Sequence, residues 1–116
     1  MPIEKESIDC VSAISVIEHG YNGKGLFREV SRILKPGGFF IASYDYWPTK
    51  IDVKAKQFFG LSWIIFDDNE VNKMDNFASN YSMKKIKTTK PLNLTKPVIK
   101  FDGFEYTFAI SIYQKQ

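Results

Sequence analysis

Residues 26–41 read LFREVSRILKPGGFFI, and this stretch decides the fold. Its apolar residues fall at positions i, i+1, i+4, i+7 and i+8, which is one face of a helix. The helix must end at Pro36 and the two glycines after it, because proline cannot continue a helix and glycine accepts a left-handed turn. Residues 39–44, FFIASY, then favour a buried strand.

A nearly continuous apolar run at residues 8–15 precedes the helix, which we expect at residues 22–34. Such a run is typical of a strand buried on both faces of a parallel sheet. Its one cysteine, Cys10, is expected to be a small buried apolar residue. The predicted strand, helix and strand form one βαβ unit, in which 8–15 and 39–44 are parallel neighbours.

The rest of the chain predicts a mostly helical and antiparallel continuation. The pattern of residues 51–59 favours a short helix. Asp67 followed three residues later by Glu70 indicates the start of a longer helix. Residues 83–89 and 104–113 both alternate between apolar and polar, which predicts an antiparallel strand pair.

Three segments together carry a family resemblance. Residues 2–11 read PIEKESIDCV, residues 15–19 read SVIEH, and residues 26–41 are the stretch quoted above. In this order and spacing they resemble the class I S-adenosylmethionine-dependent methyltransferases of the type 11 kind. The resemblance implies an α/β fold: a partial Rossmann-like methyltransferase sheet with one parallel βαβ unit and a C-terminal antiparallel strand pair. It also implies S-adenosylmethionine as cofactor.

The resemblance covers only the second half of such a domain. The family holds its cofactor with a G-x-G-x-G turn after the first strand and an acidic residue after the second. Neither is present, and the G-x-G of Gly23 and Gly25 follows Glu18 and His19 into a helix, where we interpret it as a flexible turn. We therefore expect residues 1–116 to be the C-terminal half of a methyltransferase-like domain that does not bind the cofactor alone.

Ligands of this fold bind beyond the carboxyl ends of the parallel strands. By resemblance, the first strand end contacts the cofactor and the second contacts the substrate. The candidates are Ile14, Ser15 and Val16 for the cofactor, and His19, Tyr44, Tyr46 and Trp47 for the substrate. The structural alternatives are that the apolar residues belong to the core, that the aromatic residues cover the sheet end, and that His19 opens the helix. No catalytic residue is predicted, because alignment of donor and acceptor provides much of the rate.

Composition narrows the class of protein. The net charge of +3 comes with acidic residues interleaved among the lysines, so a nucleic-acid partner is not favoured. One cysteine excludes an internal disulfide and a multi-cysteine metal site. No apolar run reaches the roughly 20 residues of a membrane span, and no leader pattern opens the sequence, which points to the cytoplasm.

Two functions follow as hypotheses. The first is a methyltransferase, as a fragment or split subunit, acting on a small-molecule methyl acceptor. The alternative is a catalytically inactive interaction or assembly protein with the same half-fold. Because the sheet would have a bare edge, the expected partner is a second copy of the chain or a missing N-terminal half.

Overall fold

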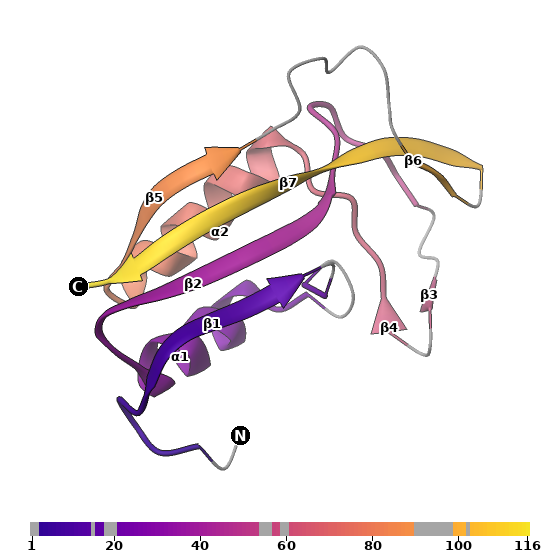
Figure 1. Ribbon diagram of the computed structural model, residues 1–116. Coiled ribbons are helices and arrows are strands. Elements are labelled where there is room, and N and C mark those ends of the chain that lie inside the picture. The colour runs from indigo at the N-terminus through magenta and orange to yellow at the C-terminus, as the bar shows by residue number, and fades with distance from the viewer. Residues whose placement is uncertain are drawn as a thin grey trace.

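The computed structural model describes residues 3–14, 16–17, 21–53, 57–58, 61–89, 99–101 and 103–116. Its main sheet runs in the order β1-β2-β7-β5, with β6 pairing with β7 (Figure 1). The strands are β1 (Ile8–Ile14), β2 (Leu34–Tyr46), β5 (Met83–Thr89), β6 (Ile99–Phe101) and β7 (Phe104–Lys115). A separate small pair joins β3 (Gln57–Phe58) and β4 (Leu61–Ser62). The helices are α1 (Gly23–Ile33) and α2 (Asp68–Asn80).

The predicted strand pairings are confirmed. β1 and β2 are parallel, with Val11 opposite Phe40, and α1 connects them. β7 is antiparallel to both β2 and β5, so the last strand inserts between two strands that precede it in the sequence. One parallel pair and an antiparallel remainder make the mixed α/β sheet that the sequence predicts.

Local sequence explains where the two helices begin. The side chain of Asn22 accepts a hydrogen bond from the Gly25 amide at 3.1 Å, and Asp67 does the same for Glu70 at 2.8 Å. Both are N-caps that satisfy amides in the first helical turn. The predicted cap at Asp67 is confirmed. The flexible turn predicted around Gly23 is wrong, because Asn22 starts α1 there.

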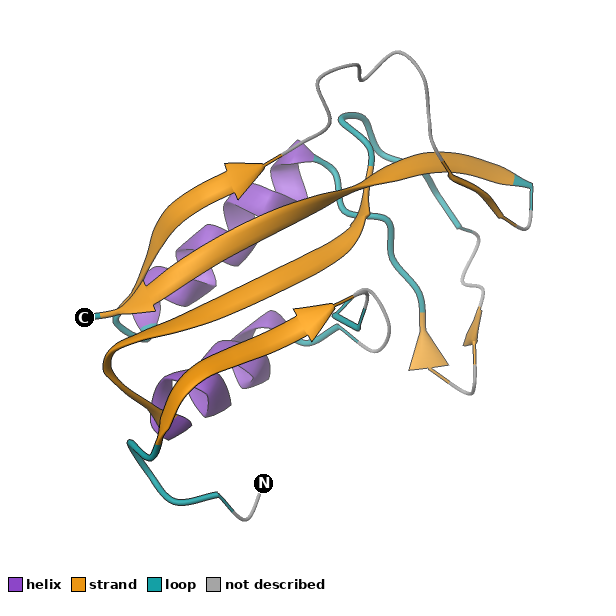
Figure 2. Cartoon of the chain, in the orientation of Figure 1, coloured by secondary structure: helices purple, strands orange, loops and turns teal. Residues whose placement is uncertain are grey.

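Both helices lie against the same face of the sheet (Figure 2). The main core forms between them and the strand side chains that point toward them. Its fully buried members include Phe27 of α1, Met74 of α2, and Phe40, Tyr44 and Tyr113 of the sheet. Phe27 contacts the rings of Phe40 and Tyr113 edge-on, at centroid distances of 5.7 and 5.1 Å. Burial on one face therefore sets which strand residues are core.

The opposite face of the sheet presents apolar side chains that no described helix covers. Ile14, Phe39 and Phe108 are 60%, 40% and 47% exposed, respectively. Cross-strand register places Ile41 opposite Ile112 on the same face, and both are half-buried. We call Ile14, Phe39, Ile41, Phe108, Ile110 and Ile112 the open face.

Two predictions about β1 are wrong. The strand is half-buried or exposed throughout, not buried on both faces, and Cys10 is exposed. The reason is the position of the strand. β1 is the edge strand of the described sheet, and the described helices cover only one face of that sheet. An apolar run indicates that a strand can be buried on both faces, but it is buried only where other elements of the fold cover both faces.

The helix predicted at residues 51–59 is also wrong. Residues 51–53 are not helical, and Gln57–Phe58 form β3, paired with β4. Residues 54–56 and 59 of the predicted helix lie outside the described residues. A second correction concerns the start of β2, which begins at Leu34 and not at Phe39. Leu34 pairs with Ile8 of β1, and the chain continues through Gly37 in a left-handed conformation with φ of 85°.

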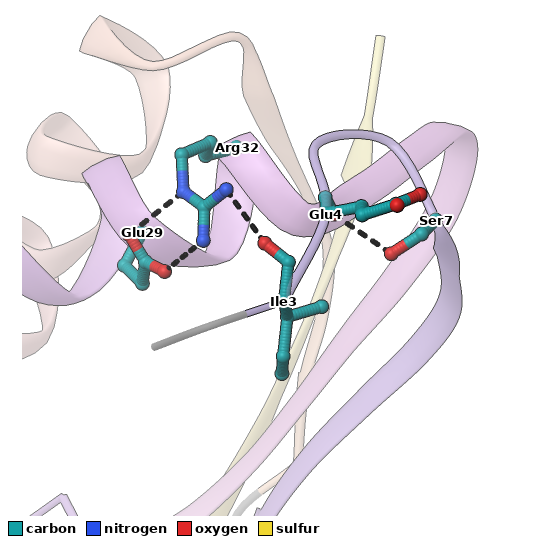
Figure 3. Close-up of polar contacts among 5 residues, drawn as sticks. All are labelled: Ile3, Glu4, Ser7, Glu29 and Arg32. Atoms are coloured by element: carbon teal, nitrogen blue, oxygen red, sulfur yellow. Dashed lines mark hydrogen bonds and ion pairs between the residues drawn. The ribbon is translucent and has the colours of Figure 1, made fainter.

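The N-terminal segment is attached to the end of α1 (Figure 3). Arg32 donates to the carbonyl of Ile3 at 2.8 Å and pairs with Glu29 one turn earlier. The amides of Glu6 and Ser7 donate to the Arg32 and Ile33 carbonyls, both at 2.9 Å. These bonds satisfy carbonyl groups that the end of a helix leaves without partners, and they set the position from which β1 enters the sheet.

Candidate functional site

The carboxyl ends of the two parallel strands lie at one edge of the sheet, where ligands bind in open α/β folds. Ile14, the last residue of β1, is 60% exposed, and Val16 just beyond it is 58% exposed. These two predicted cofactor contacts are therefore accessible surface residues and not core. Ser15 and His19, the other predicted residues of this loop, lie outside the described residues.

Two of the predicted substrate residues are buried in the core. Tyr44 and Tyr46 have no exposed surface and point toward the helices. The Tyr44 hydroxyl is 2.7 Å from the Ser111 hydroxyl, and the Tyr46 hydroxyl donates to the Asp68 carboxylate at the start of α2. The first bond joins β2 to β7 within the sheet, and the second joins β2 to α2. Trp47, the third predicted aromatic residue, is half-buried beyond the strand end.

Asp45, between the two buried tyrosines, points to the other face of the sheet. Its carboxylate accepts a hydrogen bond from the indole of Trp63 at 3.0 Å. Phe108, which is 47% exposed, is its direct cross-strand partner. Side chains at such positions are about 5 Å apart at their β-carbons. Our sequence prediction did not include Asp45, although strand alternation places it opposite Tyr44 and Tyr46.

A small second core surrounds Trp63 at this end of the sheet. It buries Val53, Trp63, Ile65 and Tyr106, and Trp47 packs against it. Trp63 meets the Phe104 and Tyr106 rings edge-on, with centroids 5.6 and 5.7 Å apart. Described residues between β2 and α2, among them Trp63 and Ile65, therefore pack against the start of β7. Asp45 lies where this cluster meets the open face.

A partly buried polar network lies on the helix-covered side of the sheet. Tyr113 donates to Asp75 at 2.7 Å, and Lys85 donates to the other oxygen of that carboxylate at 2.6 Å. Burial, together with the negative charge of Asp75, raises the pKa of the Tyr113 hydroxyl above its usual range. Because the Tyr113 hydroxyl stays neutral and donates to Asp75, this hydrogen bond has a structural role: it joins β7 to α2.

The Tyr21 hydroxyl is also buried, and among the described residues it has no hydrogen-bond partner. Burial raises its pKa above the usual range as well. Its ring packs edge-on against Phe66 at 4.8 Å, inside the main core.

A cavity of about 230 Å³ opens at the opposite end of the sheet. It lies between the end of α2 and the start of β5, near the amino ends of the parallel strands, so it is not at the expected ligand edge. The described residues contain no cluster of metal-binding side chains, and no described helix is long and apolar enough to cross a membrane. The residues that line the cavity at the end of α2 are Asp75, Ser79, Ser82, Met83, Lys84, Lys85 and Gln116.

The glycines offer a direct test of whether the described residues can hold S-adenosylmethionine. A cofactor loop needs glycines whose missing side chain leaves room for the ligand. A β-carbon on Gly23 would instead meet Tyr21 and Phe77 at 2.5 and 2.6 Å, and one on Gly25 would meet Asn22 at 2.9 Å. Both glycines accommodate the protein's own helix start. The described residues supply one apolar wall at Ile14 and Val16, but they do not fit the cofactor as a whole.

Comparison with known proteins agrees with this architecture. Residues 1–42 match the family described as methyltransferase domain. No curated relative matches the chain by sequence. Among solved structures, a S-adenosylmethionine-dependent methyltransferase from Methanosarcina mazei superposes with a TM-score of 0.67 at 11% identity, covering 99% of this chain and 62% of that one.

Two further structures show how broadly the fold is used. Geranyl diphosphate C-methyltransferase from Streptomyces coelicolor gives a TM-score of 0.69 at 14% identity, covering 100% of this chain and 49% of that one. The [4+2]-cyclase SpnF gives 0.69 at 13% identity, covering 99% and 53%. The chain thus spans between about half and two thirds of the length of these structures. It has the fold of one part of a S-adenosylmethionine-dependent methyltransferase, and its first 42 residues match the methyltransferase domain family.

Proposed function

We propose that this chain is the C-terminal half of a S-adenosylmethionine-dependent methyltransferase that acts on a small molecule. In this proposal the glycine-rich turn and the ribose-binding carboxylate come from a further stretch of polypeptide, either preceding residue 1 or on a separate chain. The observation that carries the proposal concerns β1. Within the described residues β1 pairs with β2 on one side only, and its carboxyl end exposes Ile14 and Val16 to solvent. A further strand beside β1 would complete a site at that edge.

In this proposal the described residues bind the methyl acceptor, and the completed domain binds the cofactor. Ile14 and Val16 supply an apolar wall, and Asp45 with its aromatic neighbours supplies a polar and ring-lined surface one strand away. These groups can bind and orient a methyl acceptor. Orientation is what such a transfer needs most, because a well-aligned donor and acceptor need little further catalysis. The cofactor, when bound by the completed domain, supplies the methyl group.

An inactive assembly protein is the second candidate, and the open face favours it. Ile14, Phe39 and Phe108 are large apolar side chains that are 40% exposed or more, with half-buried isoleucines between them. Apolar patches on soluble proteins commonly mark interaction surfaces. The fold itself does not fix the reaction, as the cyclase with a TM-score of 0.69 illustrates.

Calorimetric titration with S-adenosylmethionine tests the first candidate. The chain alone should show no saturable binding tighter than about 100 μM. Without the carboxylate–hydroxyl hydrogen bond the binding free energy for the cofactor falls by about 1.5–3 kcal/mol. Loss of the glycine-loop contacts as well brings the decrease to about 5 kcal/mol, which weakens the affinity more than a thousandfold. Adding the polypeptide encoded immediately upstream of residue 1, expressed separately, should restore binding.

The outcomes separate the candidates. Restored binding together with methyl transfer supports the half-enzyme. Tight binding by the chain alone would refute the statement that its glycines cannot serve the cofactor. A stable complex with the upstream polypeptide that neither binds S-adenosylmethionine nor transfers a methyl group would favour the assembly protein.

A further inference from the structure

We propose that the open face of the sheet binds an amphipathic α-helix of another polypeptide, and that this helix carries acidic side chains along the flank that faces β5. The inference goes beyond the proposed function, because it concerns a partner and holds whether or not the chain transfers a methyl group. It rests on the order of charged and apolar side chains across the open face.

Strand register arranges this face in rows that cross all four strands of the main sheet. Residues directly opposite each other on neighbouring strands share one face. One row consists of Lys84, Gln114, Phe39 and Cys10, and the next consists of Lys87, Ile112, Ile41 and Ser12. Each row therefore begins with a lysine on β5, contains a large apolar side chain on β2, and ends with a small neutral side chain on β1.

The apolar centre of the open face has the character of an interface. Phe39 and Ile14 are 40% and 60% exposed, and Ile41 between them is half-buried. Contact with an apolar partner would remove these side chains from water, which is the main favourable term in most protein association. A contiguous apolar patch with a polar border is typical of a protein–protein interaction site.

The lysines on β5 determine the charge of the partner. Lys84 and Lys87 are exposed, and neither forms an ion pair within the part of the chain that the structure describes. Binding partners commonly place opposite charges across an interface, and like charges disfavour the wrong partner. In these two rows a second copy of the chain would present only lysines and neutral residues, so its charge does not match. The matching partner is acidic along the β5 border.

The covered face of the same sheet shows how a helix meets these requirements. α2 buries Val71, Met74 and Ala78, which are spaced i, i+3 and i+7, and its Asp75 at i+4 pairs with Lys85 of β5 at 2.6 Å. Lys85 lies between Lys84 and Lys87 in the chain but on the helix-covered side, opposite Tyr113. A partner helix with the same spacing of apolar and acidic residues would cover the apolar centre and reach Lys84 or Lys87.

Fluorescence anisotropy with two fluorescein-labelled helical peptides of about five turns tests the proposal on the unmodified chain. Both peptides repeat leucine at i, i+3 and i+7, and they differ only at i+4, which is glutamate in one and glutamine in the other. We expect the glutamate peptide to bind about fivefold more tightly at low salt, which corresponds to two exposed ion pairs. High salt should remove most of this preference.

A separate label locates the bound peptide. Cys10 is the one cysteine in the sequence, it is exposed, and it lies in the same row as Phe39. A bimane fluorophore on Cys10 should therefore change its emission when the unlabelled glutamate peptide binds.

Variants separate the charged border from the apolar centre. Lys84→Gln combined with Lys87→Gln should abolish the preference for glutamate and leave binding of the glutamine peptide unchanged. Lys24→Gln combined with Lys73→Gln is the matched control, because it removes the same charge from exposed positions on the two helices, which cover the other face (Figure 2). Phe39→Ala should weaken both peptides by a similar factor of roughly threefold or more.

Several results would overturn the proposal. They are equal binding of the two peptides, no binding of either, and equal effects of the two double variants. Dissociation of a dimer of the chain by the glutamate peptide would instead assign the open face to a second copy. Adsorption to phosphatidylglycerol vesicles without peptide binding would assign it to a membrane. None of these measurements involves S-adenosylmethionine, so the calorimetric titration tests the proposed function separately.

Discussion

Lys115, the last residue of β7, should be one of the most sensitive charged positions in the chain. Its ammonium donates to the carbonyls of Ser31 and Leu34 at 2.6 and 2.9 Å, and Glu6 lies 3.7 Å away. The side chain is only 11% exposed. It therefore places a positive charge at the carboxyl end of α1, where helix carbonyls lack partners and the helix dipole is negative.

The expected loss follows from these contacts. Replacing Lys115 with Met keeps most of the side-chain volume but leaves two carbonyls without their charged donor. Hydrogen bonds to charged groups contribute about 1.5–3 kcal/mol, and a partly buried cation at a helix end contributes up to about 2 kcal/mol. The hydrogen bonds and the charge effect at the helix end arise from the same contacts of the Lys115 ammonium, so the two contributions do not add in full. We therefore expect the free energy of unfolding to fall by about 2–3 kcal/mol. For a domain of this size that lowers the melting temperature by roughly 10 °C.

Urea and thermal denaturation followed by circular dichroism measure this loss. Lys100→Met is the matched control, because the Lys100 side chain is 78% exposed and its ammonium lies 3.6 Å from a carboxylate oxygen of Glu105. An exposed pair of this kind contributes less than about 1 kcal/mol. If the two variants lose equal stability, the end of α1 does not depend on Lys115 and the reasoning is wrong.

Three further outcomes are expected. The hydrogen bond from Arg32 lowers the pKa of Glu29 from 4.5 to about 2, so its stabilising effect is present above pH 4.5 and is lost as pH falls through 2. Nuclear magnetic resonance titration should show that midpoint, and Arg32→Met should raise it. Gly37→Ala should cost roughly 1 kcal/mol in urea denaturation, because φ is 85° there and the surrounding space is open; no loss would argue against the left-handed backbone. Light scattering at ~100 μM should detect a dimer or larger assembly, since β1 forms one edge of the described sheet, next to the open face; a stable monomer would count against it.

Local sequence determined the elements whose signals are local. The helix predicted at residues 22–34, which is α1 at Gly23–Ile33, follows from its apolar face and from Pro36, which cannot continue a helix. Asp67 with Glu70 marks the start of α2. The alternation of residues 104–113 predicted β7, because burial on one face of a strand requires a period of two. The motifs of residues 2–41 predicted the family that the comparison found over residues 1–42.

Only the tertiary structure decided what surrounds each element. Cys10 and the rest of β1 are apolar enough for a core, but β1 lies at the edge of the described sheet, so they are not buried. Residues 57–58 became a strand because residues 61–62 pair with them. At the candidate site, the sequence placed Tyr44 and Tyr46 at a ligand edge, whereas strand alternation and the helix layer bury both. Asp45 faces Phe108 and Trp63 instead, because cross-strand register joins residues far apart in the chain, and one sequence does not specify that register.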